Sequence, residues 1–206
     1  MESANGNLKP SGDLALARRI RRSTGPLDLR LTPSVIVSAR AFLPNGRGSP
    51  VARARITRAA WTEPVAVLAD TLRPGLAYAY FEGTFRSADE VGQGEPLRVA
   101  TVSDVRLRGD ERPEYYGVRL SGLLRVPDDA LYTFYLSSDD GAKLRIGGET
   151  VADNDGGKGQ GQIALRRGFH PIDVVFFQAT KGAALRLEVS TPGSPRRAVP
   201  GEWFAH

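Results

Sequence analysis

The fold is decided by residues 130–157, which read ALYTFYLSSDDGAKLRIGGETVADNDGG. Residues 131–136 are mostly apolar and aromatic, and apolar residues alternate with basic ones over 143–146. A third short apolar run follows at 150–152. Alternation over runs this short is typical of β-strands that bury one face. The stretch therefore predicts three short strands, each with one buried face.

Two tight turns separate these strands. The first reads Ser138-Asp-Asp-Gly141, and the second is Gly147-Gly148. Asp-Gly and Gly-Gly are the strongest short signals for a β-hairpin, because the central residues of such turns need positive φ angles. The first turn also carries two adjacent carboxylates, and like charges repel unless a cation or hydrogen-bond donors hold them together. This turn is therefore the first candidate for a functional site.

Composition fits a chain of many short strands and turns. The 206 residues include 23 Gly and 14 Pro, and 41% of them are hydrophobic, which is enough for a packed core. The chain has no Cys. This absence excludes a disulfide framework, a thiolate zinc site and a cysteine nucleophile.

Five further segments accompany the double-aspartate stretch in a fixed order. They are Gly75–Gly83, Tyr115–Phe134, Gly168–Phe177, Ala184–Val189 and Val199–His206. Together, from about residue 75 to residue 206, they resemble the PA14 domain family. The resemblance implies an all-β fold, in which residues 76–206 form an antiparallel β-sandwich with very little helix. Alternation within each strand predicts that the following residues are buried: Leu120, Leu124, Phe134, Leu144, Ile146, Val174, Phe176 and Leu187.

The same resemblance implies a metal site at Asp139 and Asp140. In the sugar-binding branch of the family, two consecutive aspartates joined by a cis peptide bond bind Ca²⁺, which also coordinates glycan hydroxyls. Gln178 stands where the calcium-binding members carry an asparagine, and its side-chain oxygen donor is one methylene longer. The alternative is that both aspartates are turn residues whose carboxylates accept hydrogen bonds from backbone N–H groups.

A glycan at this turn would also contact neighbouring loops. The resemblance implies that residues 156–162 and 179–182 set the specificity of such a site. The complete set predicted to bind carbohydrate is Asp139, Asp140, Lys158, Gln160, Gln178 and Lys181, and the set predicted to bind metal is Asp139, Asp140 and Gln178.

The N-terminal residues differ in character from the rest. Residues 1–22 are predicted to be a basic, flexible leader that is exposed and dispensable. Residues 61–75 are predicted to be a connector that packs on the PA14-like domain. Between them, residues 23–60 contain alternating segments around a turn. This part resembles the second half of the small fibronectin-III-like module found at the C-terminal side of chitobiases and β-hexosaminidases, on the residues Thr24–Leu27, Phe42 and Ser49–Ala52.

The charge is spread unevenly along the chain. Residues 1–75 hold 12 Lys and Arg against 5 Asp and Glu, whereas residues 76–206 hold 16 against 18. The only dense basic cluster lies within residues 18–22, and Phe42 and Trp61 are the only aromatic residues before residue 76. A nucleic-acid surface interleaves basic and aromatic side chains. Their separation here predicts that the protein has no nucleic-acid partner.

Other constellations favour structural roles. Residues 153–157 begin like an EF-hand loop, but the twelfth position is Ala164 where such a loop needs glutamate. With only two histidines, His170 and His206, a histidine metal site or catalytic dyad is not expected. No two acids form a credible glycosidase pair. Sugar-stacking candidates, which could equally be packing residues, are Trp61, Tyr115, Tyr116 and Trp203.

These observations predict a non-catalytic, lectin-like accessory module of a secreted glycoside hydrolase, such as one of the β-N-acetylhexosaminidase type. Its partners would be a glycan or glycoconjugate and the tethered catalytic domain of a parent enzyme. No apolar run approaches the roughly 20 residues of a membrane span, and no signal peptide is visible. An extracellular or periplasmic location would therefore come through the parent protein. The alternative is a structural or protein-interaction module that buttresses or dimerises the parent enzyme without binding sugar.

Overall fold

In a computed structural model, the structure describes residues 22–25, 35–56, 59–155 and 158–206. The chain divides into two compact units, residues 1–58 and residues 59–206. The basic cluster at residues 18–22 lies outside the described residues except for Arg22, which is exposed. Within the described part of the chain, no helix is long and apolar enough to cross a membrane.

The described part of the first unit is a β-hairpin. Strands β1 (Val35–Ala39) and β2 (Ala52–Ile56) pair antiparallel, with Val35 opposite Ile56. Several large apolar side chains of this unit are exposed, including Phe42 and Leu43 in the turn between the strands. An isolated two-stranded hairpin is only marginally stable in water. The fibronectin-III-like module over residues 23–60 remains a prediction.

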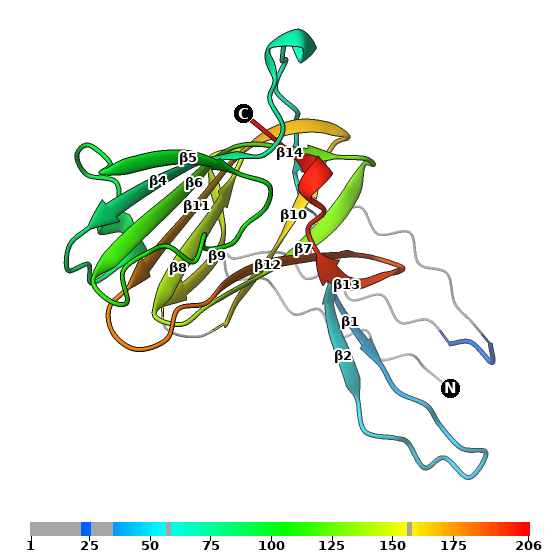
Figure 1. The fold of residues 1–206 in the computed structure, drawn as a ribbon. Coiled ribbons are helices and arrows are strands. Elements are labelled where there is room, and N and C mark those ends of the chain that lie inside the picture. Colours follow the sequence, from blue (N-terminus) through cyan, green and yellow to red (C-terminus); the bar gives the residue numbers. More distant parts are fainter. Residues whose placement is uncertain (1–21, 26–34, 57–58, 156–157) are drawn as a thin grey trace, which may run out of the picture. The chain divides into compact units, whose positions relative to one another are not determined.

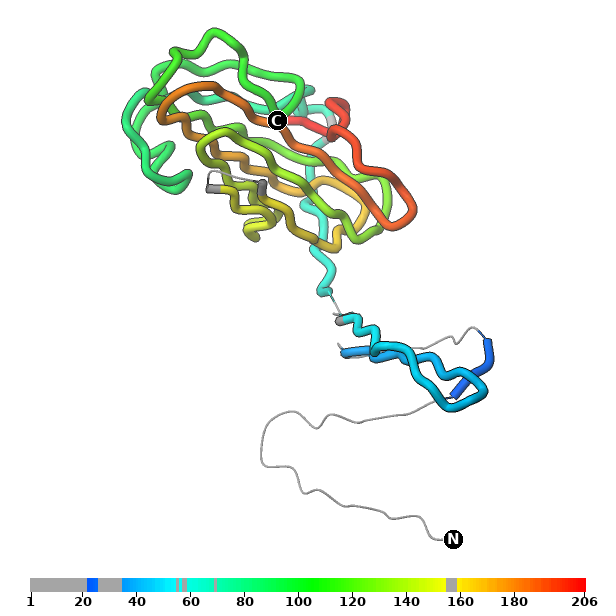
Figure 2. The backbone as a smooth tube through the Cα atoms, turned by 90° about the horizontal axis from the view of Figure 1, so that it is seen from below, coloured from blue at the N-terminus to red at the C-terminus, as the bar shows by residue number. Residues whose placement is uncertain are grey.

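The second unit is a sandwich of two β-sheets (Figures 1 and 2). The larger sheet has the strand order β5-β4-β6-β11-β8-β9, with β14 also paired to β6, and the smaller has the order β13-β12-β7-β10-β3. All pairs are antiparallel except β3 with β10. The bounds are β3 Trp61–Thr62, β4 Leu76–Glu82, β5 Arg98–Val102, β6 Tyr116–Val126, β7 Ala130–Ser138, β8 Gly141–Ile146, β9 Glu149–Asp155, β10 Lys158–Leu165, β11 Gly168–Gln178, β12 Leu185–Thr191, β13 Ser194–Ala198 and β14 Phe204–Ala205.

Helical structure in the described residues is limited to three single turns of 3₁₀ helix. They are η1 (Ala69–Thr71), η2 (Ala88–Glu90) and η3 (Gly201–Trp203). The prediction of an all-β sandwich with very little helix is therefore confirmed.

The core lies between the two sheets. All eight residues that alternation predicts to be buried are at most 4% exposed, and they come from both layers. A second, smaller cluster packs on the outer face of the larger sheet beneath η2, around Phe81, Val175 and Phe177. Val174 and Phe176 of β11 therefore face the main core, whereas Val175 and Phe177 face the smaller cluster. Because both faces of β11 are covered, its sequence is apolar at successive positions.

The two predicted turns have different roles in the structure. Gly147 and Gly148, with φ angles of 61° and 87°, join β8 to β9 as a two-residue hairpin. The prediction of a hairpin at residues 138–141 is wrong, because β7 belongs to the smaller sheet and β8 to the larger one. Strand β7 pairs with β10 and β12, whereas β8 pairs with β11 and β9. The double-aspartate turn is therefore a corner at which the chain crosses between the sheets.

The compact unit begins before residue 76, which the sequence takes as the start of the domain. Trp61 pairs with Ala164 in the smaller sheet, and Val65 forms a bridge with Phe169. At the other end of the chain, β14 pairs with β6 beside Gly122, where a Cβ atom would lie 2.5 Å from the Ala205 carbonyl oxygen. The absence of a side chain at this position allows the last strand to join the sheet.

Candidate functional site

The corner between the sheets holds Asp139 and Asp140 in different environments. Asp139 is exposed, and its carboxylate has no hydrogen-bond or ion-pair partner among the described residues. Asp140 is half-buried, and its Oδ2 atom accepts hydrogen bonds from the backbone N–H groups of Ala179 at 2.7 Å and Thr180 at 3.3 Å. The corner is thereby attached to the loop that follows β11. No peptide bond in the described residues is cis, so the cis Asp139–Asp140 bond that the resemblance implied is not present.

Gln178 lies beside this corner at the end of β11. Phe177 pairs with Gly141, so the next residue of β11 is level with Asp140, which precedes Gly141. The Gln178 side chain is fully buried, and neither its Oε1 nor its Nε2 atom has a hydrogen-bond partner among the residues that the structure describes. A buried polar group without a partner costs about 1–3 kcal/mol. The free amide therefore favours a further group that binds at this position.

The loop after β11 brings Lys181 to the same corner. Lys181 is exposed and has a φ angle of 58°, in the left-handed region that non-glycine residues seldom adopt. A Cβ atom on the next residue, Gly182, would lie 3.4 Å from the Asp139 Oδ2 atom, so this loop passes close to the free carboxylate. The structure therefore groups Asp139, Asp140, Gln178 and Lys181.

The two remaining predicted residues lie on β10. Lys158 begins the strand opposite Ser137, close in the ladder to the corner, but its side chain lies outside the described part of the structure. Gln160 is exposed and pairs with Tyr135. The preceding pair of the same two strands, Gly159 with Leu136, faces the core. Since successive residues of a strand point to opposite faces, Gln160 lies on the outer face of the smaller sheet, away from the corner.

Carboxylates alone do not form a metal site here. Within the residues that the structure describes, no group of three or more His, Cys, Asp and Glu side chains is placed to hold a metal ion. A cation at the corner would need oxygen atoms from amides, carbonyl groups or a ligand in addition to the two aspartates. Calcium accepts such mixed oxygen ligands. The Oε1 atom of Gln178 is a possible ligand, because it accepts no hydrogen bond from any described residue.

A cleft of about 380 Å³ opens next to the corner. It lies between a segment that leads into β6 and the loop after β11. Gly182, which approaches Asp139, also lines this cleft. The lining residues are Leu107, Gly109, Glu111, Arg112, Pro113, Tyr116, Gly182 and Ala183.

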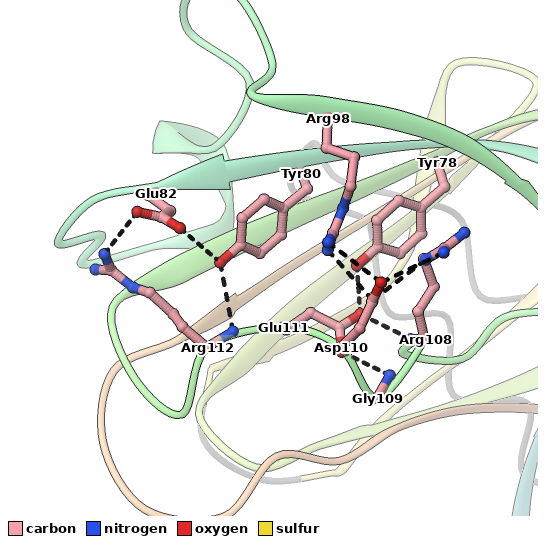
Figure 3. A network of polar contacts seen from close by, with 9 residues as sticks. All are labelled: Tyr78, Tyr80, Glu82, Arg98, Arg108, Gly109, Asp110, Glu111 and Arg112. Carbon is pink, nitrogen blue, oxygen red and sulfur yellow. Dashed lines mark hydrogen bonds and ion pairs between the residues drawn. The ribbon is translucent and has the colours of Figure 1, made fainter.

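A polar network fixes the wall of the cleft (Figure 3). The Tyr78 hydroxyl of β4 donates a hydrogen bond to the Glu111 carboxylate, which also accepts the backbone N–H groups of Arg108 and Gly109, each at 2.7 Å. Burial alone would raise the pKa of Glu111, but these hydrogen bonds outweigh it and hold the pKa below its usual range. Glu111 is therefore an ionised anchor for the segment.

The other charges of the network are also paired. Arg98 and Arg108 both contact Asp110, with shortest N–O distances of 3.2 Å. Arg112 contacts Glu82 at 2.9 Å (Figure 3). Ion pairs on a surface contribute little to stability individually, but two of these connect one irregular segment to the larger sheet, at Arg98 of β5 and at Glu82 of β4. The sequence prediction missed this wall, and the only signal for it was the dense mixture of arginine and acidic residues at 106–114.

Comparison with known proteins identifies the family. The family model for the PA14 domain matches residues 72–203. The chain belongs to the PA14 domain family.

Among curated proteins, the chain is similar to a β-hexosaminidase of Porphyromonas gingivalis, with 26% identity over 172 residues. The match covers 77% of this chain and 21% of the β-hexosaminidase, so the chain spans about a fifth of that protein.

Solved structures share the fold of this PA14 domain. A PA14 sugar-binding domain from an RTX adhesin is 19% identical with a TM-score of 0.54, over 65% of this chain and 98% of that one. The epithelial adhesin 9 A domain of Candida glabrata, solved in complex with Galβ1-3GlcNAc, is 10% identical with a TM-score of 0.59, over 72% and 96% of the two chains. At these identities the comparison concerns the fold.

Two of the four aromatic candidates serve packing. Tyr116 is 1% exposed and packs between Tyr80 and Phe176. Trp203 packs edge-on against Tyr132, which belongs to the core. Trp61 is 43% exposed but lies under the Arg166 guanidinium, 4.5 Å from its ring centre. Tyr115 is 39% exposed and has a φ angle of 57°.

His170 also has a structural role. It is fully buried, and its Nε2 atom lies 2.8 Å from the Arg166 carbonyl oxygen. Asp153, at the start of the EF-hand-like sequence, lies 3.2 Å from the Lys143 ammonium group, and residues 156–157 of that sequence lie outside the described residues. Neither feature adds a ligand-binding group to the corner.

Proposed function

We propose that this PA14 domain binds a glycan at the Asp139–Asp140 corner through a calcium ion. The observation that carries the proposal is the buried amide of Gln178, which has no hydrogen-bond partner in the described part of the chain and lies level with Asp140. The exposed Asp139 carboxylate, also without a partner among the described residues, completes an oxygen-rich corner at one end of the sandwich. Sugar-binding structures that share this fold add support.

The residues present fit a hard cation. Calcium takes 6–8 oxygen ligands, from carboxylates, amide oxygens, carbonyl groups and hydroxyls. Asp139 would supply its free carboxylate, Asp140 the oxygen that does not hold the loop, and Gln178 its side-chain Oε1. Bound calcium would attract and orient glycan hydroxyl groups. The Oδ2 atom of Asp140 keeps the 179–184 loop in place beside them, where the exposed Lys181 can hydrogen-bond a sugar.

The biological setting that we propose is a non-catalytic accessory module of a secreted glycoside hydrolase, in an extracellular or periplasmic location. The similarity to a β-hexosaminidase over 77% of this chain supports this setting. A weak sugar site tethered to a catalytic domain raises the local concentration of substrate, because rebinding becomes intramolecular. The partners would then be a glycan and the tethered catalytic domain.

A glycan array with purified protein tests the proposal. We expect binding in 1 mM Ca²⁺, and its loss in EDTA or in the Asp139→Ala variant, which removes a carboxylate without a hydrogen bond or ion pair to any described residue. Glu149→Ala, which removes an exposed carboxylate of β9, is the matched control and should bind as the wild type does. Binding that survives EDTA and Asp139→Ala would contradict the calcium site.

A second candidate function is a structural module that supports its parent enzyme without binding sugar. The observation that favours it is the Asp140 carboxylate, whose Oδ2 atom accepts the N–H groups of Ala179 and Thr180 and so contributes to the fold itself. In that case the array would be blank for every variant. Calorimetry would show no heat with Ca²⁺, while Asp140→Ala would still lower the thermal midpoint.

A further inference from the structure

We propose that the free edge of β5 pairs antiparallel with β5 of a second copy of this chain, so that the two larger sheets form one continuous sheet across a two-fold axis. The inference goes beyond the proposed function and does not depend on it. It is carried by the exposure of β5, by the neutral side chains along its outer face and by the contrast with the other sheet edges.

Strand β5 lies at the margin of the larger sheet (Figure 1). Within the described chain it pairs with β4 alone. Val99 in the strand is 71% exposed, and Leu97 directly before the strand is 69% exposed. An edge strand presents a row of unpaired N–H and C=O groups that can pair with another strand. The apolar side chains beside this row would be covered by such a strand.

Arg98 is the one charged residue of β5, and its charge is balanced within the domain. It lies opposite Tyr80, a residue of the main core cluster, and its guanidinium lies 4.7 Å from the centre of the Tyr80 ring. The same guanidinium contacts the Asp110 carboxylate at 3.2 Å. Arg98 therefore points to the inner side of the sheet and leaves no uncompensated charge along the edge.

The outer face of β5 is neutral and β-branched. Val99 lies opposite Ala79, which packs against the cluster on the outer face of the larger sheet. Thr101, two residues further on, is exposed and shares this face because side chains alternate along a strand. Valine and threonine are among the residues that strands favour. This row is therefore suited to pair with another neutral strand.

The other three sheet edges carry features that oppose such pairing. Strand β13 contains Pro195, Arg196 and Arg197, and its register with β12 is irregular. Strand β9 has an irregular register with β8 and carries the exposed acids Glu149 and Asp153. Strand β3 has two residues. Proline, charges, bulges and shortness all protect an edge from further strands, whereas β5 has no proline and pairs with β4 in unbroken register.

A second copy of the same strand matches this edge. If the five residues of β5 pair fully with their symmetry mates, Ala100 lies on the two-fold axis and Val99 lies opposite the partner's Thr101. Pairs of β-branched side chains across neighbouring strands are favourable. Arg98 would lie opposite the partner's Val102, so no like charges meet. A peptide with a strong charge of either sign would find no opposite charge on this face, and a row that matches its own reverse favours a second copy.

The pairing predicts a weak and reversible dimer. It involves one short strand from each copy, so it buries less than the roughly 800 Å² per partner of a standard interface. Association should therefore be visible at high protein concentration and reverse on dilution.

The dimer would also orient the two double-aspartate corners, a consequence that rests on the proposed function. Glu82, Tyr116 and Gln178 pair in one row across the larger sheet, and this row lies beyond the Arg98 end of β5. In an antiparallel pair, the Arg98 end of one copy lies beside the opposite end of the other. The two corners would therefore lie at opposite ends of the continuous sheet and bind two separate glycan chains.

Substitutions at Val99 test the edge with little risk to the fold, because this side chain is largely exposed. In the proposed pair the two Val99 side chains are diagonal neighbours, about 7–8 Å apart and within reach of long side chains. Val99→Lys and Val99→Glu should each place like charges together and weaken the dimer, whereas an equimolar mixture of the two variants should restore it. The matched controls are Phe42→Lys and Leu68→Lys, which alter apolar side chains that are 68% and 76% exposed and lie outside β5.

Sedimentation velocity of the full chain in EDTA, without sugar, measures association independently of the calcium site. The wild type should shift from monomer towards dimer between about 1 and 300 µM, the range in which a small interface associates. Each Val99 variant should raise the dimer dissociation constant about five- to tenfold, and both controls should match the wild type. Thermal unfolding would verify that all variants fold.

Each outcome bears on the β5 edge. A wild type that stays monomeric overturns the proposal and leaves the edge to a strand of another protein. A dimer that persists in both Val99 variants, or that is lost in Phe42→Lys, overturns it because another surface would carry the association. A mixture of the Val99 variants that stays monomeric overturns the symmetric pairing. If the dimer forms while the glycan array is blank, the proposed function fails and the β5 interface stands.

Discussion

The two aspartates of the corner differ in the contacts that they make within the fold. The Oδ2 atom of Asp140 accepts two backbone N–H groups, from Ala179 at 2.7 Å and from Thr180 at 3.3 Å, whereas Asp139 beside it has no partner among the described residues. We therefore expect Asp140→Ala to destabilise the domain even when no metal or sugar is present, and Asp139→Ala to leave its stability unchanged.

The size of the effect follows from the two hydrogen bonds. A hydrogen bond to a charged group contributes about 1.5–3 kcal/mol. The longer bond, to the exposed Thr180, contributes less because water can replace the acceptor. Removal of the carboxylate should therefore cost about 2 kcal/mol in total, which lowers the thermal midpoint of a chain of this size by roughly 4–8 °C. Asp140→Asn keeps a neutral acceptor and should lose about half as much. Asp139→Ala should stay within about 0.5 kcal/mol.

Thermal unfolding by circular dichroism at pH 7 in EDTA measures this difference, and urea unfolding provides free energies at one temperature. EDTA removes any contribution of bound calcium, so only the hydrogen bonds are compared. If the midpoint of Asp140→Ala equals or exceeds that of the wild type in EDTA, the aspartate does not hold the 179–184 loop. The repulsion between the adjacent carboxylates would then be the larger effect, and the reasoning would be refuted.

Three further predictions concern other parts of the domain. The wild type should have a higher free energy of unfolding than Glu111→Gln, because the pKa of Glu111 is lowered in the fold. This difference should be constant above about pH 5 and shrink as the pH falls below about 4.3. Urea unfolding across this pH range measures the difference, and an increase at low pH would contradict the prediction. Gln178→Asn should tighten calcium in calorimetry if the shorter amide fits the site better. Gly161→Ala should cost more than about 3 kcal/mol, or prevent folding, because its Cβ atom would lie 1.6 Å from the Val151 carbonyl oxygen.

The strands, the core and the family could be predicted from the amino-acid sequence alone. Alternation is a local property of the chain, and it identifies which side chains of each strand can be buried together. For this reason the eight predicted core residues, from Leu120 to Leu187, are all buried. The hairpin at Gly147–Gly148 was also predictable, because positive φ angles are a demand of the turn alone.

The pairing of these strands, and with it the contacts of the double aspartate, follows only from the three-dimensional fold. The same Asp-Gly signal that suits a hairpin lies at a corner at residues 138–141, because β7 pairs in the smaller sheet and β8 in the larger one. Asp140 reaches Ala179 across 39 positions of sequence, and the cleft joins residues 107–116 to Gly182 and Ala183. Such contacts depend on the register of long-range strand pairs, which the local pattern of one strand does not specify.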